Sequence, residues 1–102
     1  MIIIGAKGFA KEVLEVVAQE GLPEELYFFD NVSTDVPDIL YNQFKVLRSI
    51  NEAEAIFKSN ADKRFLLGVG DPATRYKLSS KFENIGGELA TLVSVKASMG
   101  RF

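Results

Sequence analysis

The 102-residue sequence contains neither cysteine nor histidine. Without cysteine, the chain can form no disulfide, no thiol nucleophile and no thiolate zinc site. Without histidine, it lacks the commonest general base near neutral pH and cannot assemble a Ser-His or Cys-His nucleophile. Catalysis by this chain alone would fall to carboxylates, lysine or tyrosine. The composition therefore favours a binding module.

Long apolar runs and an excess of basic charge are also absent. No apolar run approaches the ~20 residues needed to cross a bilayer, and no basic region precedes the first apolar run as in a signal peptide. We therefore expect a single cytoplasmic domain that does not bind membranes. Twelve basic and 14 acidic residues give a formal charge of −2. The basic residues are scattered and expected in solvent, which argues against nucleic-acid binding.

Strand and helix patterns alternate along the chain, with a loop expected from Val32 to Asn42. Apolar runs predict strands at residues 2–4, 26–29, 45–47, 65–69 and 88–94. Helical spacing predicts helices from Phe9 to Gly21, from Ser49 through Phe57, and from Asp71 to Gly86-Gly87. This alternation is typical of a small Rossmann-like α/β domain, three layers deep, with a mostly parallel sheet.

Side-chain patterns indicate which helix face is buried and where two helices begin. Phe9, Val13, Val16 and Val17, with Ala10 and Leu14 beside them, form an apolar stripe that we expect to pack on the sheet. Ser49, followed three residues later by Glu52, has the form of a capping box. Asp71 before proline is typical of the start of the third helix.

Three loops are predicted to meet at the carboxyl ends of the strands, where open α/β sheets bind ligands. The first, Gly5-Ala6-Lys7-Gly8, leads directly into a helix. The N-terminus of that helix has unpaired N–H groups that favour an anion. This loop is therefore a candidate phosphate site, although any tight strand-to-helix turn favours glycine. The dinucleotide fingerprint G-x-G-x-x-G is not met.

The second and third loops supply further candidates. Asp30 follows Gly8 by 22 residues, an interval at which an acidic residue commonly binds ribose hydroxyls. An Asp-Asn pair is also typical of the start of a turn, but the position of Asp30 relative to the glycine loop favours the ribose contact. In the third loop, Gly70 would let a ligand approach the backbone, whereas Asp71 has a sufficient role as a helix cap. We expect Arg75, one turn further, in solvent.

Four segments, "IIGAKGFAKEVLEVV", "YFFDN", "FLLGVGDPATRYKL" and "ATLVSVKASMG", together resemble a known family. They are similar to the N-terminal domain of bacterial nucleotide-sugar acetyltransferases, which include sialic acid O-acetyltransferases and an enzyme that N-acetylates a UDP-linked 4-amino sugar. The resemblance covers nearly the whole chain. It implies a UDP-sugar-binding domain over residues 1–93, with residues 94–102 leading into a left-handed β-helix domain that this sequence lacks.

The resemblance also implies where substrate, cofactor and partner subunits bind. The missing β-helix domain would form a homotrimer, bind acetyl-CoA and carry the catalytic histidine, so this chain alone would not catalyse acetyl transfer. No catalytic residue or metal ligand is expected here. Where the family's loop usually continues with His-Gly, this sequence has Phe9 and Ala10. The substrate-binding residues implied are Gly5, Ala6, Lys7, Gly8, Asp30, Asn31, Gly70 and Asp71.

The leading hypothesis from the sequence is a UDP-sugar-binding domain of a sugar O- or N-acetyltransferase that acts in surface glycan or polysaccharide synthesis. One alternative is an NAD(P)-binding domain of an oxidoreductase, weakened by the incomplete fingerprint. Another is a non-catalytic interaction domain that has lost its ligand. The aromatic side chain of Phe9 beside the glycine loop supports that last alternative.

Overall fold

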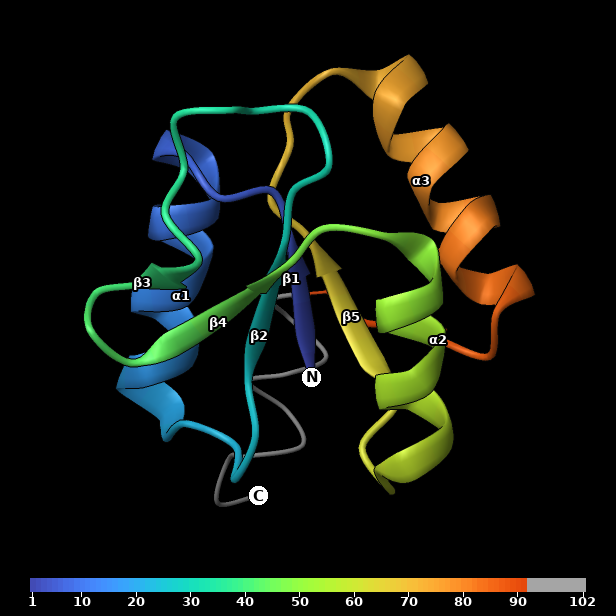
Figure 1. Cartoon of the computed structure of the whole chain (residues 1–102), viewed down its shortest axis with the longest axis horizontal. Helices are drawn as coiled ribbons and strands as arrows, with labels where there is room; N and C mark the ends of the chain where they lie inside the picture. Colours follow the sequence, from blue (N-terminus) through green and yellow to red (C-terminus); the bar gives the residue numbers. More distant parts are fainter. Residues whose placement is uncertain (92–102) are drawn as a thin grey trace.

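A computed structural model describes residues 1–91 of the chain (Figure 1). These residues form nine elements: β1 (Ile2–Ile4), α1 (Gly8–Glu20), β2 (Tyr27–Phe29), β3 (Ile39–Leu40), β4 (Phe44–Leu47), α2 (Ile50–Ser59), β5 (Arg64–Leu67), α3 (Pro72–Asn84) and β6 (Glu88–Leu89). The predicted strand at 88–94 extends past the described residues, and the predicted lead-in at 94–102 lies outside them.

The six strands form one sheet in the order β3-β4-β2-β1-β5-β6. Every pairing between neighbouring strands is parallel except that of β3 with β4. The strand order reverses at β1, because β2 lies on one side of it and β5 on the other. This arrangement confirms the predicted Rossmann-like α/β class, and it creates a switch point at the carboxyl end of β1.

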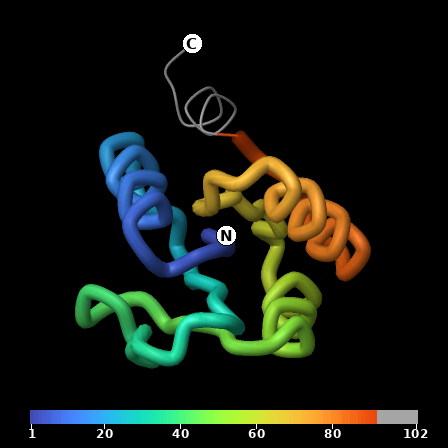
Figure 2. Tube along the Cα trace, turned by 90° about the horizontal axis from the view of Figure 1, so that it is seen from above, coloured from blue at the N-terminus to red at the C-terminus, as the bar shows by residue number. Residues whose placement is uncertain are grey.

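Helices cover both faces of the sheet, α1 on one face and α2 with α3 on the other (Figure 2). The alternating side chains of β1 serve both layers: Ile3 belongs to the core beneath α1, whereas Ile2 and Ile4 belong to the core beneath α2 and α3. Because β1 is buried on both faces, it reads as an uninterrupted apolar run.

The expected loop from Val32 to Asn42 was wrong in its last part, because it contains β3. Residues Tyr41 and Asn42 both have positive φ, at 54° and 56°, and the Gln43 N–H donates to the Leu40 carbonyl at 3.0 Å. This is the geometry of a two-residue type I′ hairpin turn. The hairpin formed by β3 and β4 therefore takes the place of a crossover helix.

The predicted helix starts are confirmed for α2 and α3. The Ser49 side chain accepts from the Glu52 N–H, and the Asp71 side chain accepts from the Thr74 N–H. The α1 stripe was wrong at Phe9, which is 42% exposed, whereas Ala10, Val13, Leu14 and Val17 are buried. Phe9 is thereby left at the surface beside the switch point.

Candidate functional site

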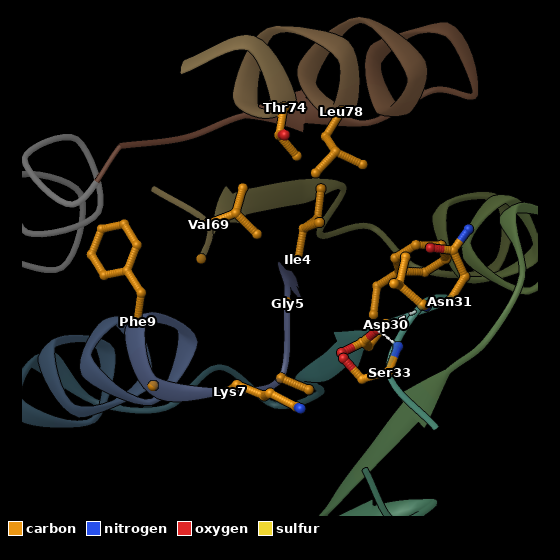
Figure 3. Close-up of a pocket in the computed structure, with 15 residues that line it drawn as sticks. Ile4, Gly5, Lys7, Phe9, Asp30, Asn31, Ser33, Val69, Thr74 and Leu78 are labelled. Carbon is orange, nitrogen blue, oxygen red and sulfur yellow. Dashed lines mark hydrogen bonds between the residues drawn. The ribbon is translucent and has the colours of Figure 1, made fainter. Parts of the chain in front are cut away.

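A pocket of about 310 Å³ lies at the switch point, where the carboxyl ends of β1, β2 and β5 meet. Figure 1 shows the loops that follow these strands gathered at the top of the molecule. Thr74 and Leu78 of α3 point into the pocket from above, toward Ile4 and Gly5 (Figure 3). Its lining is Ile4, Gly5, Ala6, Lys7, Gly8, Phe9, Phe29, Asp30, Asn31, Val32, Ser33, Gly68, Val69, Thr74 and Leu78.

The glycine loop is held against the ends of β2 and β5. The Gly5 N–H donates to the Phe29 carbonyl at 2.7 Å, and the Gly68 N–H donates to the Ile4 carbonyl at 2.8 Å. Gly5 has a φ of 108°, and a Cβ there would lie 2.8 Å from the Gly68 carbonyl oxygen. Only glycine meets both constraints without strain, so Gly5 is required by the shape of the loop itself.

The N-terminus of α1 opens at this loop without a cap. Lys7 is the N-cap residue, but its side chain caps no N–H group. The Lys11 N–H donates to the Lys7 carbonyl at 3.1 Å, whereas within residues 1–91 no acceptor pairs with the N–H groups of Gly8 or Phe9. A Cβ on Gly8 would meet nothing within 4 Å. Unpaired donors at the positive end of a helix, with open space beside them, suit an anion.

Lys7 forms an ion pair across the edge of the pocket. Its Nζ lies 2.9 Å from Asp35 Oδ1 and 3.0 Å from Asp35 Oδ2. The Lys7 hydrogen bond lowers the pKa of Asp35. In Figure 3 the Lys7 side chain extends from the glycine loop toward the side of the pocket where Asp30 and Ser33 lie. The pair therefore joins the glycine loop to the loop between β2 and β3.

Asp30 folds the start of the loop between β2 and β3. Its Oδ1 accepts from the N–H groups of Val32 and Ser33, both at 2.9 Å. Burial raises the pKa of Asp30, but the hydrogen bonds from Ser33 and Val32, together with the charge of Arg48, outweigh it, so the pKa is lowered overall. The carboxylate is therefore ionised at neutral pH. Asn31 beside it also lines the pocket.

Arg48, which follows β4, stabilises the same loop through hydrogen bonds to its backbone. Its guanidinium donates to the carbonyl oxygens of Asp30 and Ser33, both at 3.4 Å, and to that of Val36. It also lies 3.4 Å from the Asp38 carboxylate. Arg48 was expected in solvent with the other basic residues, and that expectation was wrong. An arginine that bonds several distant carbonyl groups carries no local sequence signal.

Of the eight predicted site residues, the structure brings six to the pocket. Gly5, Ala6, Lys7, Gly8, Asp30 and Asn31 line it, whereas Gly70 and Asp71 do not. The Asp71 carboxylate accepts from the N–H and hydroxyl of Thr74, at 2.9 and 2.8 Å. These hydrogen bonds lower its pKa. Ligand contacts by Gly70 and Asp71 stay predictions.

Arg75 was wrongly expected in solvent. It is half-buried, and its guanidinium donates to the Val69 carbonyl at 2.8 Å and to the Leu67 carbonyl at 3.4 Å. Arg75 thereby binds the backbone carbonyl groups at the end of β5, next to the pocket. Its side chain does not line the pocket but a second, smaller groove.

Sequence reasoning missed the contribution of α3. Thr74 and Leu78 lie one turn apart and follow the Asp71 cap at helical spacing, so both face the switch point. That spacing was a usable signal, but Leu78 also packs against the core beneath α2 and α3, so its apolar character alone does not point to a pocket. Phe9 lines the pocket at the end opposite Asp30 and Asn31 (Figure 3).

Residues 1–91 contain neither a metal-binding cluster nor a membrane-spanning helix. No cluster of three acidic side chains is placed to hold a metal ion. No helix in this part of the chain has the length and apolar character to span a bilayer.

The chain was compared with protein families, curated proteins and solved structures. The family model described as the PglD N-terminal domain matches residues 1–82. No curated protein and no solved structure shows significant similarity to the chain. The matched range includes β1 to β5, most of α3 and all the residues that line the pocket.

Proposed function

The chain belongs to the PglD N-terminal domain family, the nucleotide-sugar-binding domains of PglD-type sugar acetyltransferases, and we propose that its pocket binds a UDP-linked sugar. The observation that carries this proposal is the uncapped start of α1 beside the glycine loop. The free N–H groups there, with Lys7 next to them, suit the diphosphate of the ligand.

Asp30 and Asn31 form the end of the pocket where we place the nucleoside. An ionised carboxylate accepts hydrogen bonds from both hydroxyls of a ribose, and the lowered pKa of Asp30 keeps it ionised. Asn31 offers an amide that both donates and accepts, as the edge of a uracil ring requires. Predicted contacts from Gly70 and Asp71 would close the third side.

The structure gives little support to the two alternatives. An NAD(P) site would favour a complete G-x-G-x-x-G turn, which the sequence lacks. A pocket closed by Phe9 would have its ring across the glycine loop. Instead, Phe9 stands at the far end from Asp30, and about 310 Å³ stays open (Figure 3). The UDP-sugar proposal therefore fits the geometry better than either.

We further propose that this domain presents its substrate to an acetyltransferase of surface glycan or polysaccharide synthesis in the cytoplasm. The chain contains no histidine, so a histidine general base would come from a β-helix domain, together with acetyl-CoA and the trimer contacts. Sialic acid O-acetylation and N-acetylation of a UDP-linked amino sugar are the two reaction classes that the sequence resemblance suggests.

A thermal-shift titration of the 102-residue chain tests the binding proposal. The ligands are UDP, UDP-N-acetylglucosamine, CMP-sialic acid, NAD and acetyl-CoA. A ligand at 100 times its dissociation constant adds about 2.7 kcal/mol to the free energy of unfolding, which raises the Tm by several degrees in a domain of this size. We expect a shift with the UDP ligands and none with NAD. A shift with NAD alone would overturn the proposal.

Two variants localise the binding to the pocket. Gly8→Val fills the open space beside the α1 N-terminus, and Asp30→Asn removes charge while keeping an oxygen that accepts from Val32 and Ser33. Both should abolish the UDP shift with their Tm values in the absence of ligand near that of the unmodified chain. Asp38→Asn, whose carboxylate is 93% exposed outside the pocket, is the matched control.

A further inference from the structure

Lys7 is the single cation among the described residues that line the pocket, and it is already engaged. Its Nζ contacts both oxygens of Asp35, which lies outside the lining. The other charged lining residue is the carboxylate of Asp30. An anionic ligand therefore enters a pocket whose only positive side chain is neutralised by a neighbouring carboxylate.

The backbone beside Asp35 is held in place, whereas the ion pair of Asp35 with Lys7 is exposed and easily broken. The next residue, Val36, is buried in the core beneath α1, and its carbonyl accepts from Arg48. Asp35 is thus held at one place beside the glycine loop. The side chains of Lys7 and Asp35 are 58% and 71% exposed, however, and an ion pair of this exposure has little strength of its own.

We propose that the Lys7–Asp35 ion pair is a latch that a diphosphate opens by taking Lys7 from Asp35. This inference rests on the proposed nucleotide-sugar function and names a specificity-determining residue, Asp35, that does not itself contact the ligand. A diphosphate brings enough negative charge to the N-terminus of α1 to replace the carboxylate as the partner of Lys7. A nucleoside without phosphate leaves the ion pair in place, so Asp35 acts only on phosphorylated ligands.

Calorimetric titrations of the full 102-residue chain with UDP, uridine and inorganic pyrophosphate test the latch. The variants are Asp35→Asn, Lys7→Met and the double substitution. Asp38→Asn, which removes another carboxylate of the same loop, is the control. Because Asp35 competes for Lys7, Asp35→Asn should tighten UDP and pyrophosphate binding about two- to fivefold, the range set by exposed ion pairs. Uridine binding should not change, and the gain should shrink as the salt concentration rises.

The double-mutant cycle identifies Lys7 as the group that Asp35 controls. Lys7→Met should weaken UDP binding, and in that background Asp35→Asn should have no effect. If Asp35→Asn weakens UDP binding, Asp35 positions Lys7 for the phosphate and the latch is overturned. An equal gain with and without Lys7 would show a general charge effect and also overturn it.

The two proposals fail in different ways. UDP binding that Asp35→Asn leaves unchanged would overturn the latch alone. Pyrophosphate binding that responds to Asp35→Asn, without any UDP binding, would support the latch and overturn the nucleotide proposal. Failure of the unmodified chain to bind either ligand would overturn both.

Discussion

At the scale of single residues, Gly5 and Gly8 have different roles in the glycine loop. Gly5 has a φ of 108° and leaves 2.8 Å between a Cβ and the Gly68 carbonyl oxygen. Gly8 has ordinary backbone geometry and open space around it. Gly5 is therefore needed to fold the loop, whereas Gly8 matters for what approaches the loop.

Substitution with alanine should separate these roles. Gly5→Ala should lower the free energy of unfolding by about 1–3 kcal/mol. The alanine would have to adopt a positive φ, which is unfavourable for any residue with a Cβ, and that Cβ would lie too close to the Gly68 carbonyl oxygen. Gly8→Ala should leave it unchanged or raise it by up to about 1 kcal/mol, since the unfolded chain loses freedom and the helix gains a better former. Urea denaturation measures both. Equal effects of the two substitutions would contradict this division.

At the scale of secondary-structure elements, the three helices begin in different ways. Ser49 caps α2 and Asp71 caps α3, but no side chain within residues 1–91 caps α1. A helix N-terminus without a cap is ordinarily destabilising. The first two residues of the uncapped helix, Gly8 and Phe9, both line the pocket, which agrees with the proposal that a ligand is the missing acceptor.

The Asp71 cap can be tested apart from any ligand contact. Asp71→Ala should lower the urea midpoint, because the Thr74 N–H loses its acceptor. Asp71→Ser should keep the midpoint near that of the unmodified chain, since serine is also a good cap. Titrating Asp71→Ser with UDP then isolates the predicted ligand contact: weaker binding at unchanged stability would show that the carboxylate contacts the nucleotide.

At the scale of the whole molecule, the sequence was informative wherever local patterns coincide with local structure. The uninterrupted apolar run at β1, the caps at Ser49 and Asp71, and the glycine loop before α1 each combine a residue type with a fixed spacing. Together they predicted parallel strands with helices on both faces and three loops at one edge. Six of the eight predicted site residues follow from that edge alone.

The features that the sequence did not predict are a turn without its usual residue type and side-chain contacts that depend on the folded backbone. The hairpin turn at Tyr41-Asn42 lacks the glycine that usually marks a type I′ turn, so β3 was read as loop. Arg48 and Arg75 bond backbone carbonyls that only the finished fold brings near them. No periodicity within one segment encodes such pairings, and the same is true of the Lys7–Asp35 pair.

The starts of β1 and β5 are joined by a charged cluster that makes stability depend on acid pH. The Asp62 carboxylate lies 2.9 Å from the Arg64 guanidinium and 3.6 Å from the Met1 ammonium. Burial raises the pKa of Asp62, but the hydrogen bonds from Arg64 and the charge of the ammonium outweigh it, and the pKa falls to about 2.

Because the folded-state pKa of Asp62 is lower than that of the unfolded chain, the ionised carboxylate stabilises the fold above about pH 4, and this contribution disappears as the pH falls toward 2. Asp62→Asn should therefore lower the free energy of unfolding at pH 7 by about 1–2 kcal/mol, after allowance for screening at a side chain that is 30% exposed. Urea denaturation at pH 7, 4 and 2 measures the difference from the unmodified chain. This difference in the free energy of unfolding should become steadily smaller as the pH is lowered. A difference that stays constant from pH 7 to pH 2 would show that Asp62 acts by packing rather than by charge.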